Sequence, residues 1–278
     1  MSGRTLRIAL VTDVFHDDPD GGRLLAMLND ARGRGAELAV LPELPLDPWV
    51  PATREARQED AEGEDGPRRR RLSALAEAAR IALLGGAIVR DATTGRRHGT
   101  ALLHDAAGAL IASYRKVHLP EEEGYWETSH YEPGERAPEV VHGLGLPVGL
   151  QICSDVNRPQ GFQILAAGGA MAVLAPRATP PETYERWKLV LRANAILSSA
   201  YVISVNRPGP EPGASVGGPS LAIDPFGEVL VETTDTLSDV TVEEAVVEAA
   251  RAEYPGYLAR FPRVYAEGWA RLTTEQDP

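Results

Sequence analysis

Hydrophobic positions along the chain follow two alternating periods. Short runs of aliphatic and β-branched residues, such as LRIALVT at 6–12 and LAVLP at 38–42, have the length of buried strands. Between them lie longer stretches of helical period, such as 23–34, where Leu24 and Leu28 fall on the apolar side. Strands that alternate with helices predict a layered α/β fold.

The same pattern predicts an ordered series of elements. Strands are expected at 6–12, 38–42, 83–89, twice within 99–116, and at 147–152, 171–174 and 201–205; helices are expected at 23–34, 69–81, 160–167 and 183–198. Alternation around a central DPFG predicts a hairpin at 217–233. The Pro-, Gly- and charge-rich stretch 45–67 predicts a surface loop. Without a linker or repeat, we expect one domain over 1–278, with 1–5 and about 266–278 as terminal segments.

Composition narrows the possible classes of protein and its expected location in the cell. Hydrophobic residues make up 43% of the chain, enough for a substantial core, and the longest apolar runs are too short to span a bilayer. The net charge of -12 argues against a nucleic-acid partner. A single cysteine excludes an intrachain disulfide, and the N-terminal sequence MSGRTLRIALV lacks the features of a signal peptide. We therefore expect a cytoplasmic protein that binds neither membrane nor nucleic acid.

Three chemically useful residues each follow a predicted strand: Glu43 in AVLPELP, Lys116 in ASYRKVHLP and Cys153 in GLQICSD. Taken singly, an isolated cysteine is most often inert packing, and a loop Glu or strand-end Lys is most often solvated. A nucleophilic thiol, however, needs a base or a cation nearby. Because strand ends on the same edge of a sheet can converge on one pocket, the three together indicate a reactive site.

In this order and context, the three segments resemble the nitrilase superfamily, the carbon-nitrogen hydrolases, whose members use a Glu-Lys-Cys triad. The resemblance extends from residue 6 to 265 and implies a four-layer αββα sandwich. It makes Glu43 the general base, Lys116 the lysine and Cys153 the nucleophile. The segment GYWETSHYEPGE at 124–135 is similar to a carbamoylase-type segment, which places a fourth catalytic carboxylate at Glu127.

Elementary chemistry gives these residues compatible roles. A desolvated Glu43 would take the thiol proton and return it to the leaving amine. Lys116 can only donate, so it would stabilise the oxyanion of a tetrahedral intermediate, together with the backbone N–H of Ser154. Glu127 would hold the Lys116 ammonium in place. The product of the first half-reaction would be a thioester that water hydrolyses.

The residues after the cysteine bear on the substrate. Asp155 gives the Cys-x-Asp pattern of amidase and carbamoylase branches, whereas nitrilases usually carry Cys-Trp-Glu; a purely structural role as a turn cap stays equally open. Where carbamoylases of D-amino acids carry paired arginines, this chain has Val156 and Asn157.

Four residues are candidates to bind substrate: Ser154, Trp126, His130 and Arg177. Each has an alternative role in packing or at the surface, because nothing in the sequence fixes its direction.

The predicted function is cysteine-dependent hydrolysis of a small linear amide or N-carbamoyl amine, which releases ammonia and, in the carbamoyl case, carbon dioxide. The alternatives are a nitrilase and a catalytically silent binding protein of the same fold. No cofactor is expected, and six scattered histidines with one cysteine give no metal-ligand spacing. The resemblance also implies a homodimer or larger homo-oligomer.

Overall fold

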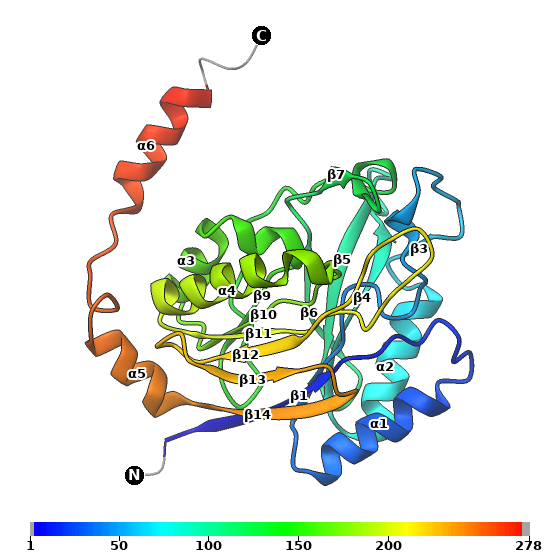
Figure 1. Ribbon diagram of the computed structural model, residues 1–278, viewed down its shortest axis with the longest axis horizontal. Coiled ribbons are helices and arrows are strands. Elements are labelled where there is room, and N and C mark those ends of the chain that lie inside the picture. The colour runs from blue at the N-terminus through cyan, green and yellow to red at the C-terminus, as the bar shows by residue number, and fades with distance from the viewer. Residues whose placement is uncertain (1–2, 274–278) are drawn as a thin grey trace.

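Two β-sheets stack face to face in the computed structural model, which describes residues 3–273 (Figure 1). The first sheet has the order β14-β1-β2-β4-β5-β6, with β3 paired to β4, and the second has the order β13-β12-β11-β10-β9. The first sheet contains β1 (Thr5–Val11), β2 (Leu38–Val40), β3 (Ala61–Gly63), β4 (Ala82–Arg90), β5 (Arg97–His104), β6 (Leu110–Arg115) and β14 (Leu237–Glu243). The second contains β9 (Val148–Leu150), β10 (Ala172–Leu174), β11 (Tyr201–Ser204), β12 (Ser220–Ile223) and β13 (Val229–Thr233).

Helices cover the outer face of each sheet. Helices α1 (Gly22–Gly33) and α2 (Pro67–Ala79) pack on the first sheet, and α3 (Gln160–Ala167) and α4 (Tyr184–Ser198) pack on the second (Figure 1). The resulting order of layers is α, β, β, α, which confirms the predicted sandwich.

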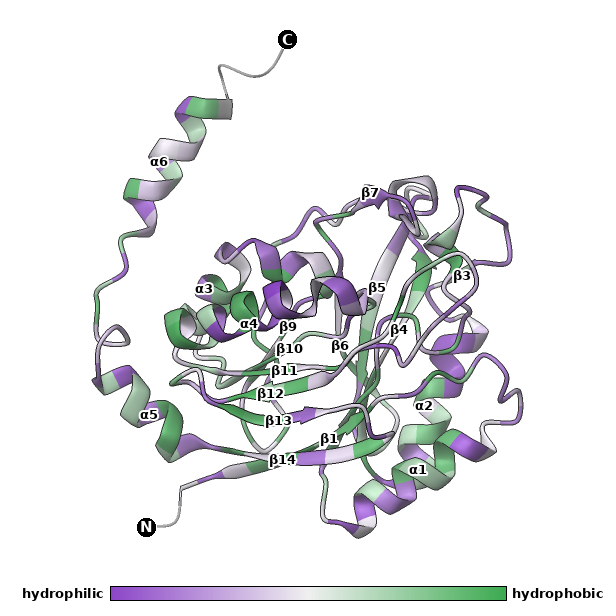
Figure 2. Cartoon of the chain, in the orientation of Figure 1, coloured by the Kyte–Doolittle hydropathy of each residue, from purple (hydrophilic) through white to green (hydrophobic). Residues whose placement is uncertain are grey.

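The hydrophobic pattern of the strands explains this layering. In β1, Leu6, Ile8 and Leu10 enter the core between the sheets, while Ala9 and Val11 enter the core beneath α1 and α2. Because both faces of the strand are covered, its sequence is apolar almost without interruption. Figure 2 shows the same concentration of hydrophobic residues on the inner strands. Both sheets contribute side chains to the core between them.

Most predicted elements lie within a few residues of the observed ones, and the 217–233 hairpin is present as β12 and β13. Helix α2 starts at Pro67 rather than at 69, because proline fits the first helical position, where no N–H is needed. The predicted loop 45–67 contains the 3-10 turn Val50–Ala52 and the short β3.

The sequence analysis missed several elements: β14, the small hairpin of β7 (Glu121–Glu122) and β8 (Tyr125–Trp126), α5 (Glu244–Ala252) and α6 (Pro262–Thr273). Residues 266–273, expected as a terminal segment, lie in α6, which extends away from the layers (Figure 1). Of the expected N-terminal segment 1–5, Thr5 already belongs to β1, and residues 1–2, like 274–278, lie outside the described residues. Within 3–273, no helix is both long and apolar enough to cross a membrane. The cytoplasmic location stays a prediction.

Candidate active site

The structure brings the three predicted strand-end residues together. Glu43 follows β2 and Lys116 follows β6, both in the first sheet, whereas Cys153 follows β9 in the second. The expectation that one edge of a single sheet carries all three is therefore wrong. The site forms where corresponding edges of two facing sheets meet.

Lys116 lies at the centre of a buried ion cluster. Its Nζ is 2.8 Å from Glu43 Oε1 and 2.6 Å from Glu127 Oε1, and all three side chains are buried. An ammonium group has three donors, so one remains for a third acceptor. Glu43 Oε2 has no hydrogen-bond partner among residues 3–273 and is free to accept a proton.

Cys153 opens a 3-10 turn (Cys153–Asn157) with φ of 45°, a left-handed conformation that is costly for any residue except glycine. Its N–H donates to the Pro176 carbonyl at 2.9 Å, and its Sγ lies 3.6 Å from the Ala178 carbonyl oxygen. The end of β10 therefore holds the thiol in place. The Ser154 N–H follows directly, at the start of a helical turn, where N–H groups lack intrahelical partners.

Burial dominates the electrostatics of the cluster. It raises the pKa of the Cys153 thiol far above the ordinary value; Glu43 raises it further, while Lys116 opposes the rise. Burial also raises the pKa of Glu127 to about 8, against the effect of Lys116. The pKa of Lys116 is well above its ordinary value because Glu127 and Glu43 outweigh its burial. The resting thiol is thus protonated and needs a base to become a nucleophile.

Asp155 joins the two turns of the site. Its Oδ1 accepts hydrogen bonds from the backbone N–H (2.9 Å) and Nδ1 (2.8 Å) of His118, and its Oδ2 accepts from Tyr114 (3.0 Å) and the Ile152 N–H (3.2 Å). Tyr114 and His118 lie two residues before and after Lys116, and Ile152 directly precedes Cys153. Of the two roles left open, the contacts support the structural one.

Arg207, which follows β11, holds the segment after Glu43. Its Nη1 donates to the carbonyls of Glu43 (2.8 Å) and Leu44 (2.7 Å), and its Nη2 donates to the Asp47 carbonyl (3.0 Å). Its Nε donates to Glu211 Oε1 at 2.5 Å, and its Nη2 forms an ion pair with the same carboxylate. Leu44 has φ of 47°, so this turn is strained like the turn of Cys153.

An apolar cluster covers the loop side of the site. It consists of Leu44, Trp49, Ile88, Tyr125, Tyr131, Ala178, Ala214 and Val216. Ala214 and Val216 belong to the Gly- and Pro-rich segment 208–218. In this segment, Glu211 accepts a hydrogen bond from the Trp49 N–H at 2.6 Å, and the Ser215 carbonyl accepts one from the Tyr125 hydroxyl at 2.8 Å. Cys153 is only 3% exposed, and the cavity beside Glu43 has a volume of about 10 Å³, room for one water at most. Cys153 is thus almost completely covered in this conformation.

The four predicted substrate-binding residues are placed differently. Ser154 Oγ donates to the His118 carbonyl, and Trp126 stacks beneath the Arg54 guanidinium at 3.9 Å. A role in substrate binding stays a prediction for both.

His130 and Arg177 are hydrogen-bonded to other protein groups. His130 Nε2 bonds the Thr53 carbonyl at 2.7 Å, which joins two loops. Arg177 is fully buried, its Nε donates to Ser204 Oγ at 3.0 Å, and it lies close enough to Cys153 to interact with it electrostatically. Both side chains are buried, and a role in substrate binding stays a prediction for both.

The sequence analysis missed Arg207 and the two tyrosines, Tyr125 and Tyr131. Arg207 lies two residues after the predicted strand 201–205, almost as close to a strand end as Glu43 and Cys153, so the strand-end criterion would have found it. Tyr125 and Tyr131 lie within the segment already singled out for Glu127, but nothing in the sequence gave their direction.

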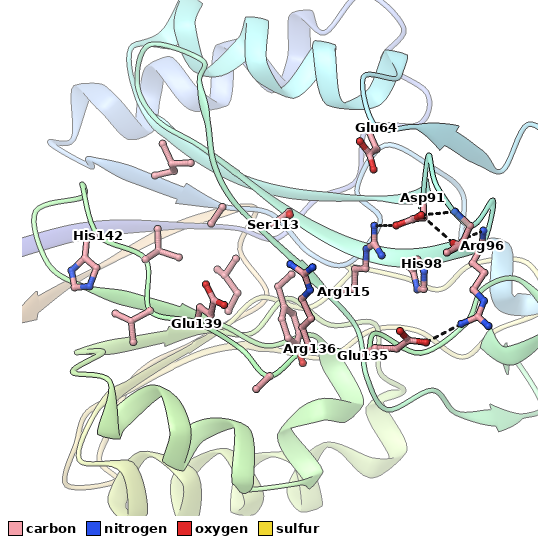
Figure 3. Close-up of a pocket in the computed structure, with 18 residues that line it drawn as sticks. Glu64, Asp91, Arg96, His98, Ser113, Arg115, Glu135, Arg136, Glu139 and His142 are labelled. Atoms are coloured by element: carbon pink, nitrogen blue, oxygen red, sulfur yellow. Dashed lines mark hydrogen bonds and ion pairs between the residues drawn. The ribbon is translucent and has the colours of Figure 1, made fainter.

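A larger cavity of about 660 Å³ lies apart from this cluster, between β6 and residues 135–142 (Figure 3). Its walls include the ion pair of Arg115 with Asp91, and Arg136 points into it without a dashed contact. None of the four clustered residues lines it. Tyr114, the donor to Asp155, is one of the residues that line this cavity, so it connects the cavity with the site.

Comparisons with known proteins agree on one family. The family model described as carbon-nitrogen hydrolase matches residues 14–252. A hydrolase of Schizosaccharomyces pombe is 30% identical over 98% of this chain and 87% of its own length, and a chloroplastic omega-amidase of Arabidopsis thaliana is 28% identical over 82% of this chain and 64% of its own. The structure of the NitN amidase from Nesterenkonia sp. AN1 matches with a TM-score of 0.77 and 27% identity, covering 95% of this chain and 99% of that one. A variant of that amidase carries the acetamide moiety of fluoroacetamide on its active-site cysteine.

Proposed function

The chain belongs to the carbon-nitrogen hydrolase family of the nitrilase superfamily, and on that premise we propose that it hydrolyses a small linear amide or N-carbamoyl amine through a thioester on Cys153. The observation that carries the proposal is the buried cluster in which Lys116 contacts both Glu43 and Glu127 beside the thiol. Such a cluster is expensive to bury, and packing alone gives no reason for it.

The proposed first half-reaction starts with proton transfer. Glu43 Oε2 accepts the Cys153 proton as Sγ attacks the substrate carbonyl carbon. The carbonyl oxygen becomes an oxyanion, which accepts the third N–H of Lys116 and the Ser154 N–H. The tetrahedral intermediate then collapses: the C–N bond breaks, Glu43 returns the proton to nitrogen, and ammonia or an amine leaves.

The second half-reaction repeats these roles with water. As the water oxygen attacks the thioester carbon, Glu43 takes a proton from that water molecule, and Lys116 again stabilises the oxyanion. The C–S bond breaks, and the proton held by Glu43 returns to Sγ. A carboxylic acid leaves, or a carbamic acid that decomposes to carbon dioxide and an amine.

A homodimer is part of this proposal. The segment from α5 to α6 exposes Tyr257, Phe261, Val264 and Tyr265, each more than 60% accessible. A row of large apolar side chains on an arm that leaves the body fits a second copy of the chain better than solvent. We expect light scattering to give twice the chain mass, and Phe261→Arg to reduce it; a monomeric wild type would contradict this part.

The test of function is ammonia release by wild type and by Cys153→Ala across primary amides, N-carbamoyl amines, N-carbamoyl amino acids and nitriles. We expect turnover of an amide or carbamoyl class by wild type and none by the variant. A second variant, Lys116→Met, should also lose activity. Its matched control is Lys188→Met, which changes the one lysine outside the cluster and should keep full activity. Equal turnover by wild type and Cys153→Ala would contradict the proposal, and turnover of nitriles alone would favour the nitrilase alternative.

A further inference from the structure

The turn after β10 holds Cys153 at two points. The Cys153 N–H donates to the Pro176 carbonyl at 2.9 Å, and Sγ lies 3.6 Å from the Ala178 carbonyl oxygen. Arg177 is the residue between these two carbonyls. Because Cys153 has a left-handed backbone with φ of 45°, its conformation persists only while the surroundings hold it. The placement of the thiol therefore depends on the turn to which Arg177 belongs.

The side chain of Arg177 fastens this turn to the next two strands of the second sheet. It is 1% exposed, and its Nε donates to Ser204 Oγ at 3.0 Å, at the end of β11. Its Nη1 donates to the Thr179 hydroxyl, and its Nη2 donates to the Pro219 carbonyl, directly before β12. Each nitrogen of the guanidinium group thus has a protein acceptor, and the planar group fixes three segments at once.

Thr179 connects the same turn to the first sheet. Its N–H donates to Asn206 Oδ1 at 3.0 Å, and the Asn206 N–H donates to Ser220 Oγ at 3.0 Å. Ser220 Oγ lies 2.7 Å from the hydroxyl oxygen of Thr12, the residue after β1. All four side chains are buried. A paired network of this kind rigidifies the backbone around it, because its rupture would leave buried polar groups unpaired.

Arg177 also carries a charge that no carboxylate balances. Among the described residues, no carboxylate forms an ion pair with it, and the titratable groups that act on it are Cys153 and Tyr184. Burial lowers the pKa of Arg177 to about 10, so the guanidinium group stays charged near neutral pH. The two other buried cations of this region, Lys116 and Arg207, both form ion pairs with glutamates. Arg177 therefore gives the surroundings of Cys153 a surplus of positive charge.

The chemistry of Cys153 gives this surplus a use. Loss of the thiol proton leaves a negative charge on a buried sulfur, which Glu43 and Glu127 oppose and Lys116 favours. We propose that Arg177 is a positioning residue for Cys153: it fixes the turn that holds the thiol, and its unbalanced charge stabilises the negative charge that develops on sulfur. The inference rests on the proposed function, because it takes Cys153 to be the nucleophile.

Alkylation by iodoacetamide tests the thiol directly, since Cys153 is the one cysteine of the chain and the reaction needs no turnover. We expect Arg177→Met to react about tenfold more slowly than wild type near neutral pH, which shifts the plot of rate against pH by about one unit to higher pH. Arg177→Lys keeps the charge, and its rate should stay within about threefold of the wild-type rate.

Arg251→Met is the matched control. Arg251 is a half-buried arginine whose Nη2 donates to the Ala170 carbonyl at 2.7 Å, before β10 rather than after it. The substitution removes the same charge at the other end of the same strand, so we expect no change in the alkylation rate.

Several results would overturn the inference. Two of them are an Arg177→Met variant that reacts as fast as wild type, and an Arg177→Lys variant that reacts as slowly as Arg177→Met. Iodoacetate carries a carboxylate, so a loss confined to this reagent would make Arg177 a binding residue for a substrate carboxylate and would contradict the proposed role. If Arg177→Met does not fold, Arg177→Gln replaces it, because glutamine keeps a donor for the nearby acceptors. Failure of all three variants to fold would assign the guanidinium group to the fold alone and would also overturn the inference.

Ammonia release keeps this inference apart from the proposed function. We expect kcat of the Arg177 variants to fall in parallel with their alkylation rates, while KM changes less. If the order of alkylation rates holds but wild type releases no ammonia from any compound of the panel, the inference about the thiol stands and the proposed function fails.

Discussion

Replacing Arg207 by methionine tests whether the strained turn after Glu43 is held from the second sheet. The guanidinium is fully buried and spans from the end of β11 to the carbonyls of Glu43, Leu44 and Asp47. Methionine fills similar volume but provides neither the charge nor the donors. The carbonyls of Glu43 and Asp47 would then lack a hydrogen-bond partner among the described residues.

The expected cost follows from what is left unpaired. Removal of one partner of a buried ion pair costs about 3–5 kcal/mol, because the other charge stays buried, here on Glu211. Total stabilities lie at about 5–15 kcal/mol, so the loss is a large share but need not unfold the protein. Substituting Glu211→Gln as well removes the stranded charge, and we expect the double variant to recover about 2 kcal/mol relative to additivity.

The assay is urea unfolding of wild type, both single variants and the double variant, with kcat measured on each folded protein. We expect kcat of Arg207→Met to fall by more than about tenfold while KM changes less, because the general base loses its fixed position. A stability loss under about 1 kcal/mol, or additive effects of the two substitutions, would refute this role of Arg207.

Three further changes test other parts of the site and fold. Lys116→Met should reduce kcat/KM by at least about 1000-fold, since the oxyanion loses its charged donor, and a loss under tenfold in the ammonia assay would contradict that role. Burial raises the pKa of Glu127 to about 8, so above pH 8 this group adds a second negative charge beside the thiol. We therefore expect kcat/KM to fall above pH 8, and we expect Glu127→Gln to abolish this inflection in the pH profile. Burial lowers the pKa of His104 to about 4, so the neutral ring stabilises the fold above the unfolded pKa of about 6.5, and this contribution is lost as pH falls toward 4. Thermal melts should therefore show His104→Leu to be less acid-sensitive than wild type by about 2 kcal/mol at pH 4.5, and parallel pH dependences would contradict it.

Much of the architecture was predictable from periodicity. Most of the predicted strands and helices carry strong apolar patterns, because helices cover the outer face of each sheet and the inner faces pack together. β14 was less predictable, since polar residues outnumber apolar ones in its LSDVTVE sequence, and its identity depends on pairing with β1 more than 200 residues away. Such a long-range partner leaves little trace in a local pattern.

The residues of the site also divide into those that the sequence could predict and those that it could not. Glu43, Lys116 and Cys153 could be found because each directly ends or follows a strong strand, and the fold then decides which ends meet. The directions of His130 and Arg177 could not be found in this way, since they depend on contacts with Thr53 and Ser204, distant in sequence. The role of Arg207 depends on a turn 160 residues earlier in the chain.

The thioester on Cys153 is the central claim, and partition by hydroxylamine tests it most directly. A primary amide and a methyl ester of the same acid are turned over in hydroxylamine, and the ratio of hydroxamate to free acid is measured for each. A common acyl-enzyme predicts the same ratio from both substrates at every hydroxylamine concentration, with neither product formed by Cys153→Ala. A ratio that depends on the leaving group, or product formation without Cys153, would contradict the account.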